Sequence, residues 1–278
     1  LPTPSLTSNS NTRIQRSTLQ DVGIILPKLN QKLKKLYMTQ DNQSYFEVIE
    51  NLKRTHDVDD VTKLNLGITH NTINQTYDTI ATCFLHQLEW MNTLNDSTLK
   101  QYLYAINSAI AQFVGIQNNS TTVNIQNFFK ATPVRLTGPM YLYRVETWDE
   151  YNPKDDSRGI NRLKKTWAGF RDDRVKSCSF TPHIKTRENF KGDKLIIKIP
   201  DGTKLPAIVI GATQGFPWIS HGEEYEVLLP AGLYYKTRLL IDPLPPRPAY
   251  PSDTFQRDKT KYWESNKHNF HAEVTVTK

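Results

Sequence analysis

The sequence predicts an α+β fold in which a helical region is followed by a β-rich region. Apolar residues in the first half recur at spacings of three and four, which is typical of amphipathic helices. From about residue 125 the pattern changes to short segments that are rich in β-branched and aromatic residues and separated by Gly, Pro and Asp. Helices that come first and strands that follow, without alternation, favour an α+β over an α/β architecture.

Four helices are expected from the apolar spacing. They span residues 19–37, 44–52, 73–94 and 96–115. Pro27 predicts a break or a kink in the first of them. The sequence Asp-Ser-Thr at Asp96 predicts the N-cap of the last, and Gly115 predicts its C-cap. One side of the 73–94 helix is apolar and is expected to face a core, through Ile80, Cys83, Phe84, Leu88 and Met91.

Seven strands are expected after the Asn-rich segment 117–124, which predicts a loop. In sequence letters the strands are MYLYRVE, VKSCSFT, KLIIKIP, AIVIGA, YEVLLP, YYKTRLLI and AEVTVT. The Pro-rich segment 243–251 cannot be a central strand and predicts an excursion before the last one. These patterns divide the chain into a flexible tail at 1–18, a helical lobe at 19–115 and a β-rich core at 125–278, and the lobe and the core can form one compact unit.

The composition argues against several classes of protein. The 278 residues contain no apolar run near the roughly 18 residues that a membrane helix needs, so we expect a soluble protein without a membrane span. The seven histidines and two cysteines show no metal-ligand spacing, so no metal site is expected. The net charge of +7 reflects either a basic surface alone or an anionic partner, which would be a dinucleotide, a nucleic acid or an acidic protein.

The segment His221–Pro230 holds the most informative polar pattern. If it forms a strand, Glu224 and Glu226 share one face and Tyr225 points into the opposite layer. Two carboxylates on one face repel each other, so they are either solvated or kept for chemistry. Taken alone, the pattern favours a solvated strand face.

Two other predicted strands carry polar residues of interest. Ser179 and Thr181 share a face, where their hydroxyls can orient a carboxylate or a ribose, or can simply be half exposed. Arg144 interrupts an aromatic and aliphatic strand, where a charge is costly unless it has a partner. Its planar guanidinium suits a phosphate or a carboxylate, and the alternative is an ordinary salt bridge to a glutamate in the same layer.

The order of an arginine strand, a Ser-x-Thr strand and a Glu-x-Glu strand resembles the arginine–serine–glutamate class of mono-ADP-ribosyltransferases. That family includes cholera-like and actin-modifying toxins, phage-borne transferases and vertebrate ecto-enzymes. The segment EYEVLLPAG is similar to the family's glutamate strand, and SFT stands where the family usually has Ser-Thr-Ser. The helix LKQYLYAINSAIAQF resembles the helix that precedes the arginine strand. The resemblance covers roughly residues 96 to 278 and implies an NAD-binding core of two packed, mostly antiparallel sheets.

The resemblance also implies a reaction and a role for each residue. NAD would be the co-substrate, and ADP-ribose would be transferred to a side chain of a target protein. Glu226 would hold the 2′-hydroxyl of the nicotinamide ribose and stabilise the developing cation, and Ser179 would fix Glu226. Arg144 would grip the phosphate or ribose end of NAD, while Glu224 would act on the incoming acceptor. Further candidates for contact with NAD are Thr181, Arg187 and Phe190.

The acceptor and the target are predicted less directly. The loop TQGFPWISHG is where the family recognises targets, so Phe216 and Trp218 either contact the target or join the core. In the family, a glutamate at the position of Glu224 usually accompanies arginine acceptors, although some bacterial members with this pattern modify threonine on ubiquitin. The family implies a secreted toxin or injected effector that acts on a protein in the cytosol of a host cell.

Two alternatives remain at this level. One is an NAD glycohydrolase, in which water is the acceptor. The other is a basic binding module for nucleic acid or an acidic host protein, with a degenerate transferase fold. The joint presence of three strand motifs argues against degeneracy, and the lack of a nucleic-acid-binding motif argues against a nucleic-acid partner. The sequence leaves open whether the N-terminal helices dock the target, brace the NAD site, or both.

Overall fold

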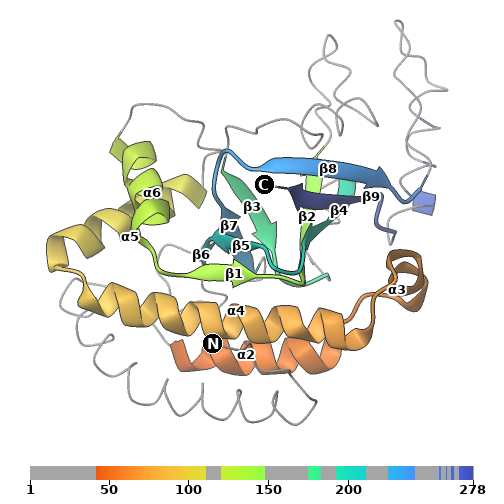
Figure 1. Ribbon diagram of the computed structural model, residues 1–278, viewed down its shortest axis with the longest axis horizontal. Helices are drawn as coiled ribbons and strands as arrows, with labels where there is room; N and C mark the ends of the chain where they lie inside the picture. Colours follow the sequence, from red (N-terminus) through yellow and green to blue (C-terminus); the bar gives the residue numbers. More distant parts are fainter. Residues whose placement is uncertain are drawn as a thin grey trace, which may run out of the picture.

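The computed structural model describes residues 42–110, 120–147, 175–182, 192–210, 225–241 and 269–277, with isolated positions at 257, 261, 264 and 265. Within these residues, five helices and nine strands form the predicted α+β structure, which is therefore confirmed (Figure 1). The helices are α2 (Asn42–Thr55), α3 (Asp60–Leu66), α4 (His70–Thr93), α5 (Asp96–Ile110) and α6 (Ser120–Ala131). The strands are β1 (Arg135–Thr137), β2 (Met140–Thr147), β3 (Lys176–Ser179), β4 (Gly192–Ile199), β5 (Lys204–Pro206), β6 (Ile208–Val209), β7 (Glu226–Leu229), β8 (Tyr234–Leu239) and β9 (Ala272–Thr277).

Seven of these strands form one sheet in the order β6-β7-β3-β2-β4-β9-β8. Its pairs are antiparallel except for β4 and β9, which run parallel. A second, two-stranded sheet pairs β1 with β5 in antiparallel fashion. The order brings β7, β3 and β2 side by side, and their register places Glu226, Ser179 and Tyr143 in one row across the three strands.

Helix α4, which is 24 residues long, runs along one side of the strands, and α2 lies alongside it on the side away from the strands (Figure 1). The apolar side that the sequence predicted is buried, at Ile80, Cys83, Phe84, Leu88 and Met91. Buried side chains of the helices and of the strands join in a single hydrophobic cluster. Burial of this apolar surface is the main favourable contribution to folding.

Polar side chains of α4 complete the hydrogen bonds of strand backbones. Gln87, which is 3% exposed, donates from Nε2 to Val209 O at 2.8 Å and accepts from Val209 N at Oε1 at 2.9 Å. Its amide therefore bonds the outer edge of β6 as a neighbouring strand would. Thr76 Oγ1 accepts from Tyr141 N at 3.0 Å, and the Cys83 thiol donates to Arg135 O at 3.4 Å. These bonds fix the position of α4 relative to β6, β2 and β1.

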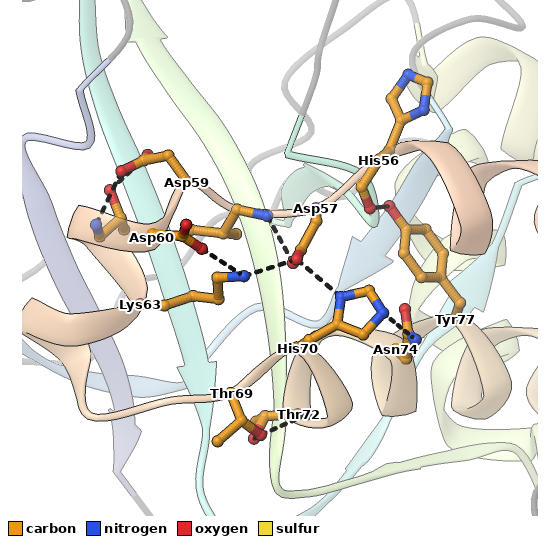
Figure 2. Close-up of polar contacts among 12 residues, drawn as sticks. His56, Asp57, Asp59, Asp60, Lys63, Thr69, His70, Thr72, Asn74 and Tyr77 are labelled. Carbon is orange, nitrogen blue, oxygen red and sulfur yellow. Dashed lines mark hydrogen bonds and ion pairs between the residues drawn. The ribbon is translucent and has the colours of Figure 1, made fainter.

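The connection from α2 to α4 is a polar junction that contains α3 (Figure 2). Asp59 caps α3 by accepting from Thr62 N at 2.8 Å and from Thr62 Oγ1 at 2.7 Å. Asp57 Oδ2 accepts from Lys63 Nζ and is bonded to His70 Nδ1, both at 2.7 Å. Partial burial acts to raise the pKa of Asp57, but the hydrogen bonds from Lys63 and His70 bring it below its ordinary value. The junction thus holds the start of α4 to the end of α2.

Some element boundaries differ from the sequence prediction. Asn95 rather than Asp96 caps α5, since its Oδ1 accepts from Thr98 N at 2.8 Å and the helix begins one residue later. The predicted loop at 117–124 is wrong from Ser120 onward, where α6 begins. Helix α3 and strands β1 and β5 were not predicted, because segments this short carry too few periodic positions. The predicted helix at 19–37 lies outside the described residues.

We predict that Gln87→Leu lowers the free energy of unfolding by about 2–4 kcal/mol, because it leaves the buried N–H and C=O of Val209 without the side chain that bonds them. Urea unfolding followed by circular dichroism measures the effect. Gln101→Leu on the exposed side of α5 is the matched control and should change stability by less than about 0.5 kcal/mol. Equal losses in the two variants would contradict the role of Gln87 at the sheet edge.

Candidate functional site

The candidate active site lies on the three adjacent strands β2, β3 and β7. Glu226 is the first residue of β7 and is 7% exposed. Ser177 Oγ on β3 donates to Glu226 Oε1 at 2.5 Å. A hydrogen bond of this length to a carboxylate is a strong, charge-assisted one. The sheet therefore presents a nearly buried carboxylate that a hydroxyl on the adjacent strand holds in place.

The residue that holds Glu226 is not the serine that we predicted from the sequence. Ser179 Oγ instead accepts from Thr181 N at 3.2 Å and lies 3.4 Å from Thr181 O. Ser177 and Ser179 are two residues apart on β3, so alternation places them on the same face and does not distinguish them. The signal that could have identified Ser177 is the sequence Ser177-Cys178-Ser179, which is closer to the family's Ser-Thr-Ser than SFT is.

Arg144 connects β2 to β3. Its Nε donates to Glu146 Oε1 at 2.7 Å and its Nη1 donates to Ser177 O at 2.6 Å, while only 13% of its side chain is exposed. The salt bridge that the sequence left as an alternative is therefore present. Burial acts to lower the pKa of Arg144, but the Glu146 carboxylate raises it above its ordinary value, so the charge is retained. Arg144 thus holds the backbone of the serine whose hydroxyl binds Glu226.

Thr181 is buried beneath the site. Strand β3 ends at Ser179, so the prediction that Ser179 and Thr181 share a strand face is wrong. The side chain of Thr181 has no exposed surface, and its Oγ1 lies 3.4 Å from the Tyr77 hydroxyl of α4. That hydroxyl also donates to the carbonyl oxygen of His56 at 3.1 Å (Figure 2). These contacts favour a supporting role for Thr181 over direct contact with NAD.

The Glu-x-Glu segment is not a regular strand. Strand β7 begins at Glu226, and Tyr225 has a φ of 48°, in the left-handed region. The alternation that was predicted to bring Glu224 and Glu226 to one face therefore does not continue through Tyr225. Glu224 lies outside the described residues, and so do Arg187, Phe190, Phe216 and Trp218, whose roles stay predictions.

Cys178 lies between the two serines, but its thiol is unreactive. Burial raises the pKa of Cys178 to about 12 and that of Cys83 also to about 12, so both thiols are protonated at neutral pH. Both cysteines are free. Within the described residues, no group of His, Cys, Asp and Glu side chains is arranged to hold a metal ion. None of the helices described there is long and apolar enough to cross a membrane.

Comparison with known proteins gives matches among solved structures. No family model and no curated protein matches the chain. Among solved structures, the chain is similar to BECa, an ADP-ribosylating toxin of a binary enterotoxin of C. perfringens, in a crystal structure with NADH. The two are 16% identical, the match covers 69% of this chain and 45% of that chain, and the TM-score is 0.36. The chain thus matches less than half the length of the toxin.

We predict that Arg144→Lys lowers the free energy of unfolding by about 2–3 kcal/mol, because a lysine cannot bond Glu146 and the Ser177 carbonyl together and leaves one of them buried and unpaired. The matched control is Arg238→Lys, since Arg238 also bonds a glutamate, Glu273, but is 56% exposed. That control should cost less than about 1 kcal/mol. Urea unfolding of both variants tests this, and equal costs would mean that Arg144 does not hold β2 to β3.

Proposed function

We propose that the chain is an NAD-dependent mono-ADP-ribosyltransferase, which transfers ADP-ribose from NAD to a side chain of a target protein. The observation that carries the proposal is the hydrogen-bonded series Arg144–Ser177–Glu226 on three adjacent strands. Its arginine, serine and glutamate stand in the chain order of the class that the sequence resembles. Three residues that are remote in sequence and joined in space support a site more strongly than the motifs do separately.

Glu226 is suited to stabilise positive charge beside a ribose. Its Oε1 is held by Ser177, and its low exposure limits competition from water. A preorganised carboxylate in such a site stabilises a developing cation more than a solvated one does. In the proposed reaction, the bond between ribose C1′ and the nicotinamide nitrogen breaks, and nicotinamide leaves as a neutral molecule with the bonding electron pair. Glu226 stabilises the transition state, which resembles an oxocarbenium ion as in glycoside hydrolysis.

The acceptor then forms a new bond to C1′ and loses a proton. We assign Glu224 to the acceptor, as a base or as the group that orients it. Arginine is the first candidate for the acceptor side chain and threonine the second. Direct contact of NAD with Arg144, Arg187 and Phe190, and of the target with Phe216 and Trp218, belongs to the same proposal. So does a role as a secreted toxin or effector that modifies a host protein.

Glu226→Gln should reduce NAD cleavage and transfer by about a hundredfold or more, which corresponds to roughly 3 kcal/mol in the barrier. The amide keeps the shape of the side chain but lacks the charge that stabilises the cation. The rate of nicotinamide release, monitored by chromatography, measures the loss of activity. Glu89→Gln, on the exposed side of α4, is the control and should keep wild-type turnover. A folded Glu226→Gln protein with a third of wild-type turnover would rule out the assigned role.

Glu224→Gln distinguishes a transferase from a glycohydrolase. Because Glu224 is assigned to the acceptor, its loss should suppress transfer to protein at least about tenfold more than it suppresses hydrolysis of NAD, a difference near 1.4 kcal/mol. Intact-mass measurement of modified protein and release of nicotinamide give the two rates. If both fall to the same degree, Glu224 serves NAD binding or cleavage. If neither falls, Glu224 has no part in the reaction.

A further inference from the structure

Tyr225, which directly precedes Glu226, has an unusual backbone conformation. With a φ of 48°, it is the only residue other than glycine that has a positive φ in the part of the chain that the structure describes. The left-handed region is sterically disfavoured for any residue with a Cβ, and especially for a bulky one. Such a conformation persists only where the surrounding contacts hold it.

Backbone hydrogen bonds hold this residue and the next one from two strands. Phe180 N, at the end of β3, donates to Tyr225 O at 3.0 Å. Ile210 N, at the end of β6, donates to Glu226 O at 3.0 Å. From Glu226 onward, β7 pairs with β3, and Glu226 is opposite Ser179. The chain therefore enters the sheet at the candidate catalytic residue directly after a residue in the left-handed conformation.

The ring of Tyr225 is held by a series of aromatic contacts that begins in α4. It packs on Phe180 with ring centroids 5.6 Å apart. Phe180 has no exposed surface and meets Tyr77 edge to face, at 6.3 Å and an interplanar angle of 88°. The Tyr77 hydroxyl is in turn bonded to the backbone of His56 (Figure 2). Tyr225 is thus the last ring of a series whose other end is fixed in the helices.

We infer that Tyr225 is a positioning residue that directs the carboxylate of Glu226 toward Ser177, an inference that rests on the proposed function. The contact with Phe180 maintains the left-handed conformation of Tyr225. That conformation sets the direction in which the next side chain leaves the backbone. Glu226 Oε1 accepts from Ser177 Oγ only while that direction is kept. Tyr225 acts through Glu226 and has no contact of its own with the reacting atoms in this assignment.

Three substitutions separate the ring from the backbone conformation. Tyr225→Phe keeps the ring, and its kcat for NAD hydrolysis should stay within about twofold of wild type. Tyr225→Asn removes the ring but tolerates a positive φ, and its kcat should fall by about threefold to fivefold. Tyr225→Val removes the ring and also opposes the positive φ, because a β-branched side chain is the least compatible with it, so its kcat should fall about tenfold further. In Tyr225→Asn and Tyr225→Val, kcat should change more than KM for NAD, since the charge of Glu226 acts mainly in the transition state.

The measurement must distinguish misdirection of Glu226 from a loss of folded protein. Each kcat is therefore divided by the number of NAD sites, which calorimetric titration with NAD provides. Tyr234→Val is the matched control, because Tyr234 is 41% exposed at the start of β8 and a strand accommodates valine well. It should keep the wild-type kcat.

Several outcomes would overturn the inference. One is a Tyr225→Val protein whose kcat per site lies within twofold of wild type. Another is an equal kcat for Tyr225→Asn and Tyr225→Val, which would mean that the left-handed conformation has no part. A third is a reduced number of sites with an unchanged kcat per site, which would limit Tyr225 to folding. A wild-type protein that does not cleave NAD would instead refute the proposed function, and this inference with it.

Discussion

The contact between helix α4 and the strands is the constraint on which the candidate site depends. Gln87 bonds β6, Thr76 bonds β2 and Tyr77 lies against the residues that follow β3. Arg144, Ser177 and Glu226 lie on β2, β3 and β7, and these strands are among or next to the ones that α4 contacts. Helix α4 therefore sets the relative positions of the three residues. Apolar burial holds α4 to the sheet without regard to direction, whereas the buried hydrogen bonds allow only one register. The position of the Glu226 carboxylate therefore depends on helix α4, although Glu226 itself lies on a strand.

The hydrogen bonds that join β2, β3 and β7 require the charge of Arg144 to lie inside the sheet. A nearly buried guanidinium loses hydration, and that loss is offset only when good partners satisfy it. Arg144 finds one partner in the Glu146 carboxylate on its own strand and another in the Ser177 carbonyl on the next. The second bond matters more for the site, because it fixes the backbone of the residue that donates to Glu226. A salt bridge and a functional role, which were alternatives at the level of sequence, are thus compatible in one residue.

The sequence was sufficient to predict most helices and strands, but not the side-chain contacts between them. The apolar period of α4 and the apolar segments that form β2, β4, β7 and β9 are local properties, and they were predicted correctly. The choice between Ser177 and Ser179 was not local, because both lie on one face: the register places Ser179 opposite Glu226, yet the carboxylate bonds the diagonal neighbour Ser177, so the direction of the Glu226 side chain decides. The left-handed conformation of Tyr225 also could not be predicted, since tyrosine has no preference for it, whereas the ring packs on Phe180. The prediction of Asp96 as the N-cap of α5 failed for a simpler reason. Two adjacent residues, Asn95 and Asp96, can both cap the helix, and the packing of the helix selects one.

The same contacts bear on what the helical region does. Target docking and support of the NAD site were both open, and the described contacts favour support. The series Tyr77–Phe180–Tyr225 reaches from α4 to the residue before Glu226, and the junction around Asp57 holds the beginning of α4 to α2. Because the hydrophobic cluster contains side chains of the helices and of the strands together, the strands that the structure describes share their core with the helices. A helical lobe that serves only to recognise a partner would not need to share its core with the sheet. We therefore regard α2 and α4 as part of the machinery that holds the candidate active site in its geometry.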